Sequence, residues 1–186
     1  FWSAFSENRG AVIGLTVVCF VVLLALFAPL LAPYNPVEQF KGATKLPPFW
    51  SEGHDPRFWL GTDAVGRDML SRLMLGARLS LFMGITPVLM AFVAGTAIGV
   101  LAGYAGGTLN SVIMRTIDVF YAFPSVLLAI ALSGALGAGI GNALLSLTVV
   151  FVPPIARVAE SVTTQVRARD FVEAARRAVA RTYPAI

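Results

Sequence analysis

Three long uncharged runs divide the chain, and shorter charged segments separate them. The runs extend from Gly10 to Val37, from Leu79 to Met114 and from Val119 to Ala156. Each run exceeds the about 20 residues that an α-helix needs to cross the hydrocarbon core of a bilayer. Together with their prolines and glycine-rich turns, they predict four membrane spans, over residues 10–33, 79–102, 112–133 and 144–166. We therefore expect an all-α, polytopic integral membrane protein.

A cleaved signal peptide is the competing interpretation of the first run. The apolar stretch after Asn8 and Arg9 is too long for an ordinary signal-peptide core, and further spans follow it. We expect residues 1–9 to precede the first span, and residues 10–33 to form it.

Residues 34–78 form a polar segment between the first two spans. Their prolines exclude a continuous helix, and aromatic residues alternate with charges, which is typical of a loop at the level of the lipid headgroups. These aromatic residues are Phe49, Trp50, Phe58 and Trp59. Near the end of the loop, Thr62 or Asp63 is expected to cap an amphipathic interfacial helix, in which Asp68 and Arg72 would pair at i,i+4.

Gly95, Gly99 and Gly103 recur at every fourth position of the second span. Small residues at this spacing let another helix approach closely in lipid. The alternative is that glycine is simply common in membrane helices. Three glycines in register favour helix packing.

Arg115 and Asp118 lie three residues apart near the start of the third span, and Pro124 follows them. The first interpretation is an ion pair between the two side chains that anchors this end of the helix, because an unpaired charge in a span is costly. A position along a translocation path is the alternative.

The chain becomes charged after the last span while it keeps a helical pattern. Phe171, Ala175 and Val179 would share one face of a helix, and Glu173 and Arg177 would pair at i,i+4 on another. Such a helix can place its apolar face on a partner protein. A solvated helix next to the membrane is the alternative.

Composition narrows the classes of function. The sequence is 57% hydrophobic and 13% charged, whereas soluble domains carry roughly a quarter charged residues. The single cysteine, Cys19, cannot form an intrachain disulfide, and the single histidine, His54, has too few neighbouring ligands for a metal site. The sequence has no Walker A pattern for ATP binding. Catalysis, metal binding and nucleic-acid binding are therefore not expected of this chain.

The basic residues indicate an orientation in the membrane. Four spans place both ends of the chain on one side, together with eight arginines: Arg9, Arg115, Arg157, Arg167, Arg169, Arg176, Arg177 and Arg181. The other side would hold six basic residues, balanced by five acidic ones in the same loop. Because lysine and arginine are enriched in cytoplasmic segments, we expect both ends in the cytoplasm.

Two motifs carry a resemblance to a known family. The run Asp170-Phe-Val-Glu-Ala-Ala-Arg176 resembles the EAA loop of bacterial ABC importer permeases. The pattern before the second span is similar to the signature of dipeptide, oligopeptide and nickel permeases: Leu60-Gly-Thr-Asp63, Gly66-Arg-Asp68 and Ser71-Arg72. Residues 114–124 and 154–160 resemble the same family. By this resemblance the chain is identified as a member of the permeases of binding-protein-dependent ABC importers.

The resemblance implies a helical bundle of the ABC importer permease type that imports peptides or similar small solutes. It assigns ATPase coupling to the residues Asp170, Phe171, Val172, Glu173, Ala174, Ala175 and Arg176. It makes candidates for the translocation path of the residues Asp118, Phe120, Phe123 and Pro124. The implied partners are ABC ATPase subunits, a second homologous permease and an extracytoplasmic substrate-binding protein, in the plasma (inner) membrane of a bacterium. The chain would hold no cofactor, and ATP and Mg would be bound by the ATPase.

The resemblance ends near Ala178, and we expect residues 1–186 to lack the two spans that it implies after the EAA loop. Residues 79–166 therefore hold spans two to four, and residues 167–186 the coupling helix and a truncated or gapped tail. Two other classes of function are alternatives. A secondary transporter driven by an ion gradient would need ionisable residues deep in its spans. A membrane assembly subunit without transport would leave the amphipathic segment after residue 166 without a purpose.

Overall fold

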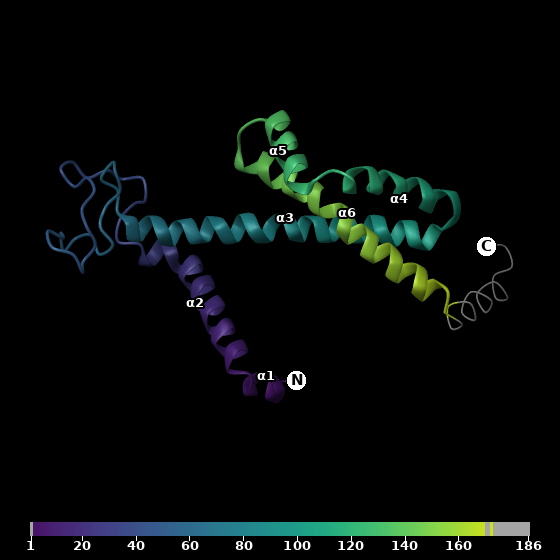
Figure 1. Ribbon diagram of the computed structural model, residues 1–186, viewed down its shortest axis with the longest axis horizontal. Helices are drawn as coiled ribbons and strands as arrows, with labels where there is room; N and C mark the ends of the chain where they lie inside the picture. The colour runs from purple at the N-terminus through teal and green to yellow at the C-terminus, as the bar shows by residue number, and fades with distance from the viewer. Residues whose placement is uncertain (1, 170–171, 173–186) are drawn as a thin grey trace. The chain divides into compact units, whose positions relative to one another are not determined.

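The computed structural model describes residues 2–169 and Val172, and its regular secondary structure over this part of the chain is helical (Figure 1). The helices are α1 (Trp2–Glu7), α2 (Arg9–Leu31), α3 (Met69–Ala105), α4 (Gly107–Tyr121), α5 (Ser125–Leu136) and α6 (Ile140–Arg167). The chain divides into two compact units, Phe1–Met83 and Gly84–Ile186, and α3 contributes to both. The predicted all-α fold is confirmed.

Three helices are long and apolar enough to cross a membrane, namely α2, α3 and α6. Their best windows have mean hydropathies of 3.0, 2.1 and 1.6. Even α2, the shortest with 23 residues, is about 35 Å long at a rise of 1.5 Å per residue, which exceeds a hydrocarbon core of about 30 Å. The helices α4 and α5 together make a fourth candidate span.

In the first unit, Asn8 caps the start of α2. Its side-chain oxygen accepts a hydrogen bond from the backbone N–H of Ala11 at 3.2 Å, which satisfies a donor that the first helical turn leaves free. The helix ends at Leu31, two residues before Pro33. The bounds of α2 therefore lie within two residues of the span predicted over residues 10–33.

The loop between α2 and α3 has a small aromatic core of its own. The rings of Tyr34, Phe40 and Phe58 contact one another, with centroids 5.0 to 5.5 Å apart. Phe58 is only 1% exposed, so the expectation that it lies among lipid headgroups is wrong. Phe49, Trp50 and Trp59 are exposed. The loop is thus a folded element, in which one of these four aromatic residues, Phe58, is buried.

The first turn of α3 is capped by Asp68, and the expectation that Thr62 or Asp63 caps it is wrong. The carboxylate of Asp68 accepts hydrogen bonds from the backbone N–H and the hydroxyl of Ser71, at 2.8 and 2.6 Å. The Ser71 hydroxyl oxygen also accepts a bond from the backbone N–H of Tyr34 at 3.1 Å, which ties the start of the loop to the start of α3. Because Asp68 is buried and engaged in this way, the predicted pair with Arg72 does not form.

The predicted interfacial helix is not a separate element. It forms the first turns of α3, which continues as one helix of 37 residues from Met69 to Ala105. No proline lies between the amphipathic turns and the start of the apolar span at Leu79, so the two join in one helix.

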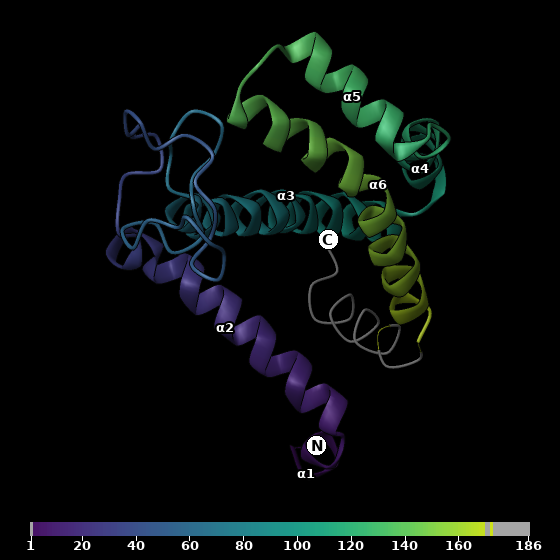
Figure 2. The same cartoon turned by 60° about the vertical axis from the view of Figure 1, so that its left-hand side comes forward.

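In the second unit, α4 and α5 both pack against α6 (Figures 1 and 2). A turn over residues 137–139 joins α5 to α6. The side-chain amide of Asn142 donates hydrogen bonds to the carbonyls of Leu136 and Gly137, at 2.7 and 3.2 Å, and so satisfies acceptors at the end of α5.

The span predicted over residues 112–133 falls on two helices, α4 and α5. The helices α4 and α5 meet at an angle of 90°, at a break between Tyr121 and Ser125. Pro124 lacks a backbone N–H and disfavours a helical conformation at the residue before it, which favours a break at this position. By contrast, α6 continues past Pro153 and Pro154.

Candidate functional site

The predicted ATPase-coupling segment lies almost entirely outside the described residues. Of its seven members only Val172 is described; its backbone N–H donates to the carbonyl of Arg169 at 3.0 Å. The other six are Asp170, Phe171, Glu173, Ala174, Ala175 and Arg176. The coupling role of this segment stays a prediction.

The break between α4 and α5 borders a cavity of about 330 Å³. Two translocation-path candidates, Phe120 and Phe123, line it together with Tyr121. The opposite wall belongs to α6 and includes Pro153 and Pro154. The other residues that line it are Ser125, Leu128, Val150 and Phe151. Pro124 occupies the cap position of α5 at the same break. The structure therefore brings three of the four candidates to one place, with largely apolar and aromatic walls.

Asp118 is paired with Arg157 of α6, and the expected pair with Arg115 is wrong. The Nε and Nη2 atoms of Arg157 both donate to Oδ1 of Asp118, the first at 3.1 Å, and the guanidinium carbon lies 5.2 Å from the ring centroid of Tyr121. Spacing within one helix suggested Arg115, but the packing of α4 on α6 supplies a partner 39 residues away. Both side chains of the pair are about half exposed, at 47% for Asp118 and 49% for Arg157.

A second polar contact between the same two helices was missed by the sequence analysis. The side-chain amide of Asn110 in α4 donates to Oε1 of Glu160 in α6 at 2.6 Å, and also to the carbonyl of Ala102 at 3.2 Å. Thr164 donates to the same Glu160 oxygen at 3.1 Å. In the sequence, Asn110 and Glu160 are polar residues near the ends of apolar runs, but their spacing gives no reason to expect a hydrogen bond between them.

The three glycines of α3 are buried against α6. A Cβ atom built on Gly95 would lie 3.0 Å from the side chain of Ile155, and one on Gly99 would lie 2.7 Å from the Cβ of Ala159. A Cβ atom on Gly103 would lie 2.8 Å from the Cβ of Thr163. All three distances are shorter than, or at the limit of, contacts that real Cβ atoms make. The backbones of α3 and α6 therefore approach each other at these positions as only glycine permits.

Arg167, the last residue of α6, reaches the end of α3. Its Nη1 atom donates to the carbonyl of Gly103 at 3.3 Å, and the guanidinium lies over Gly106, which has a φ of 67°. A positive charge near the C-terminal end of a helix is favourable, because the free carbonyls there carry partial negative charge.

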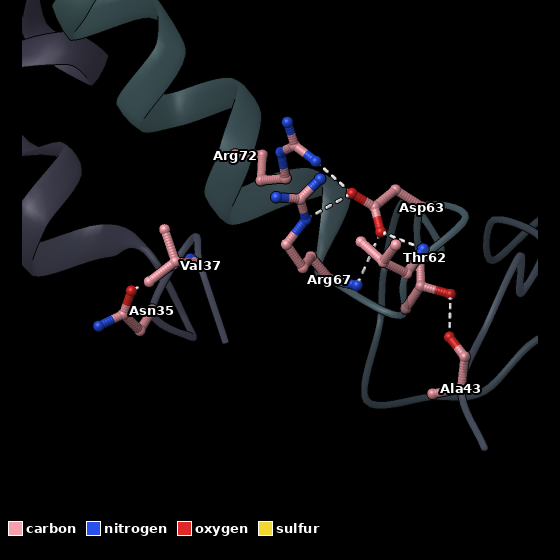
Figure 3. A network of polar contacts seen from close by, with 8 residues as sticks. Asn35, Val37, Ala43, Thr62, Asp63, Arg67 and Arg72 are labelled. Atoms are coloured by element: carbon pink, nitrogen blue, oxygen red, sulfur yellow. Dashed lines mark hydrogen bonds and ion pairs between the residues drawn. The ribbon is translucent and has the colours of Figure 1, made fainter. Parts of the chain in front are cut away.

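The polar network of the loop centres on Asp63 (Figure 3). Its carboxylate accepts from the backbone N–H groups of Val65 and Arg67 at 2.9 and 3.0 Å, from Nε of Arg67 at 2.8 Å, and from Nη1 of Arg72. The backbone N–H of Arg67, followed by its guanidinium, holds the pKa of Asp63 well below its usual range. Beside it, Thr62 accepts from the backbone N–H of Leu46 at 2.9 Å and donates to the carbonyl of Ala43.

These contacts give the loop signature a structural role. Asp63, Asp68 and Ser71, which the family signature contains, hold the loop closed on itself and on the start of α3. Among the described residues, no three or more His, Cys, Asp and Glu side chains come together in a way that could hold a metal ion.

Two family models match the chain. The model described as the N-terminal TM domain of oligopeptide transport permease C matches residues 1–48. The model described as the binding-protein-dependent transport system inner membrane component matches residues 95–178. The second match includes the three glycines, the α4–α5 break, α6 and the segment predicted to couple to an ATPase.

Curated relatives match over nearly the whole chain. The dipeptide transport system permease protein DppC of Escherichia coli (strain K12) is 47% identical over 176 residues, which are 95% of this chain and 59% of the relative. The di/tripeptide transport system permease protein DppC of Pseudomonas aeruginosa is 43% identical over 182 residues, which are 98% of this chain and 60% of the relative. The dipeptide transport system permease protein DppC of Haemophilus influenzae is 42% identical over 172 residues, which are 92% of this chain and 58% of the relative. The chain thus spans about three fifths of the length of these relatives.

Proposed function

Because the chain belongs to the family of binding-protein-dependent transport system inner membrane components, we propose that it acts as a permease subunit of an ATP-driven importer of short peptides. The observation that carries the proposal is the identity of 42%, 43% and 47% with three permeases named for dipeptides or tripeptides, over more than nine tenths of this chain. The substrate class rests on those names.

The partners follow from the kind of importer. A binding-protein-dependent system uses an extracytoplasmic binding protein to deliver substrate and an ABC ATPase to supply energy, and a second homologous permease would complete the pathway. The ATPase would hold ATP and Mg. Both ends of residues 1–186 would lie in the cytoplasm, which is supported by the excess of arginine on that side.

The mechanism needs two elements of this chain. Residues 170–176 would dock on the ATPase and receive its motion, and α6, which ends at Arg167, would carry that motion into the membrane. The cavity at the α4–α5 break would be part of the substrate path, since its aromatic walls fit apolar side chains of varied shape. ATP binding can shift the spans between two arrangements only if docking differs in affinity between them.

The first experiment tests coupling in the complete importer, purified with its ATPase and reconstituted with its binding protein in liposomes. Ala174→Asp places a charge within the predicted docking helix, and we expect loss of ATPase capture and of ATP-dependent uptake of a labelled dipeptide. The same change at Ala168, an exposed residue just before the motif, is the matched control and should leave both intact. Unchanged uptake and capture in the Ala174 variant would contradict the proposed docking site. Absence of ATP-dependent uptake by the wild-type complex would contradict the proposed function itself.

A further inference from the structure

We propose that Arg157 and Asp118, with Glu160 and Asn110, form a polar clasp that makes α4 follow α6, so that motion arriving at the end of α6 reaches the wall of the cavity at the α4–α5 break. Arg157 and Asp118 are the positioning residues of this clasp. The inference rests on the proposed function and adds to it the residues that transmit the movement inside the membrane domain.

The first observation is the geometry of the Arg157 side chain. It contacts α4 at two points one helical turn apart: two of its nitrogens donate to the same oxygen of Asp118, and its guanidinium carbon lies 5.2 Å from the ring centroid of Tyr121. A planar guanidinium held by a carboxylate and by an aromatic ring is fixed in position as well as in orientation.

The second observation is that a separate bond holds the other half of α4. Asn110, two turns before Asp118, donates to Glu160 at 2.6 Å, and Glu160 lies three residues after Arg157. The order of the contacts is therefore reversed along the two helices, as in an antiparallel pair. Two bonds at separate levels restrict both rotation of α4 and sliding along α6, which a single bond would not do.

The third observation is the surroundings of the pair. Asp118 and Arg157 both lie on helices of the membrane domain, and about half of each side chain is exposed. Charged groups inside a membrane are stable only when they are paired or face water. If α4 and α6 separated, both charges would lose their partners at once, so the two helices are favoured to move as one body.

The position of the clasp gives it a transmitting role. Three residues after Asp118, α4 ends at Tyr121, and Phe120 and Tyr121 already line the cavity. Ten residues after Arg157, α6 ends directly before the predicted coupling segment. The clasp therefore lies between the receiving end and the cavity wall, and α4 has no other ion pair to α6 among the residues that the structure describes.

The test is a charge exchange in the complete importer, with transport of a labelled dipeptide measured per ATP hydrolysed. Asp118→Arg and Arg157→Asp each place like charges together, and we expect each to lower the transport per ATP by about tenfold while ATPase activity persists. The double variant D118R/R157D restores an opposite pair and should recover most of the loss. Arg157→Lys keeps the charge but removes the two-nitrogen contact, so its loss should be about threefold.

Arg115→Asp is the matched control. Arg115 is an exposed residue on α4, one turn before Asp118, and it has no ion pair within the described part of the chain. The same reversal of charge there should leave transport per ATP unchanged. Wild-type coupling in the single variants at 118 and 157, or no recovery in the exchanged pair, would overturn the clasp. If the single variants do not assemble, recovery of assembly in the exchanged pair supports the clasp, and its absence overturns it.

A distance measurement separates failure of the clasp from failure of the proposed function. Spin labels would be attached to cysteines introduced at Val112 in α4 and Val162 in α6, which are both more than half exposed. Cys19→Ser would first remove the single cysteine of residues 1–186. We expect one narrow distance distribution with and without ATP in the wild type, and a broad one in Asp118→Ala. A wild-type shift between the two states of more than about 5 Å, one helical turn, would overturn the clasp even in a complex that transports peptide.

Discussion

Helix α6 contacts α3 and α4 in different ways. Towards α3 the contact is made by backbone, since Gly95 and Gly99 leave room only for the surface of Ile155, Ala156 and Ala159. Towards α4 it is made by long polar side chains, in the pairs Arg157–Asp118 and Glu160–Asn110. The first contact depends on volume and the second on charge and hydrogen bonding.

This difference indicates which changes each face tolerates. Close-packed backbone has no room for an added methyl group, and its attraction falls off steeply with distance. Polar side chains can adjust by rotation, but they are destabilising when one partner is removed and the other is left unpaired. Substitutions that change volume should therefore act on the α3 face, and substitutions that change polarity should act on the α4 face.

The largest effect is expected from adding volume on the α3 face. Gly99→Ala would place its methyl group 2.7 Å from the Cβ of Ala159, so one helix must shift, at a cost of about 2–3 kcal/mol. The thermal stability of the detergent-extracted protein and the yield of assembled complex measure this. Gly99→Leu should lower both further.

Gly84→Ala is the matched control on the same helix. A Cβ atom at Gly84 would meet nothing within 4 Å, and alanine favours a helix over glycine by up to about 1 kcal/mol. We expect this variant to be neutral or slightly more stable than the wild type. Equal losses in the two variants would show that glycine is needed for reasons other than the approach of α6.

A smaller effect is expected from removing one polar contact on the α4 face. Asn110→Ala would leave the Glu160 carboxylate with Thr164 as its hydrogen-bond donor, at a cost of about 1–2 kcal/mol in the same stability assay. Ser111→Ala is the control, since that exposed hydroxyl bonds only to Gly107 of its own helix. If both variants were as stable as the wild type, the polar face would contribute little.

The smallest effect is expected from acid, and it should fall on the loop rather than on the α3 face. The pKa of Asp63 is held below its ordinary value of 3.8, first by the backbone N–H of Arg67. Because the pKa is lower in the folded loop than in the unfolded chain, the charged carboxylate stabilises the folded loop at pH values above the ordinary pKa. This stabilisation is lost as the pH falls below that value, so the loop should be unchanged between about pH 8 and 5. The measurement is the rate of limited proteolysis of the loop as a function of pH, with tryptophan fluorescence as the readout.

Asp63→Asn sharpens the same measurement. The variant lacks the charge at every pH. Its loop should therefore be cleaved faster than the wild-type loop at neutral pH, and the two cleavage rates should become similar only in acid. A wild-type loop that opens between about pH 7 and 5 would contradict the assignment of Asp63 as a carboxylate that stays charged over this pH range.

The spans could be predicted from the sequence because they depend on composition over many residues. The uncharged runs placed α2 and the apolar parts of α3 and α6, and the glycine register indicated a close helix contact before its partner was known. Pro124 marked a disturbance of the third span. Its 90° bend was not predictable, because the angle depends on how α4 and α5 each pack on α6.

The polar contacts were predicted poorly because they depend on residues far apart in the chain. Spacing within a helix predicted the ion pairs Arg115–Asp118 and Arg72–Asp68. In the structure, Asp118 is bound by Arg157 and Asp68 by Ser71. In each case the structure provided a competing donor that spacing along one helix could not reveal. The candidates at the α4–α5 break were identified through the family motif.

The contact between Arg167 and the end of α3 has a consequence for sequence variation. Gly106 lies beneath that guanidinium with a φ of 67°, so a side chain at position 106 would both strain the backbone and displace the arginine from the carbonyl of Gly103. A chain that loses Arg167 loses one of these two constraints on position 106. Among relatives, positions 106 and 167 should therefore change together, and a shortened residue at 167 should be the step that precedes the loss of the glycine.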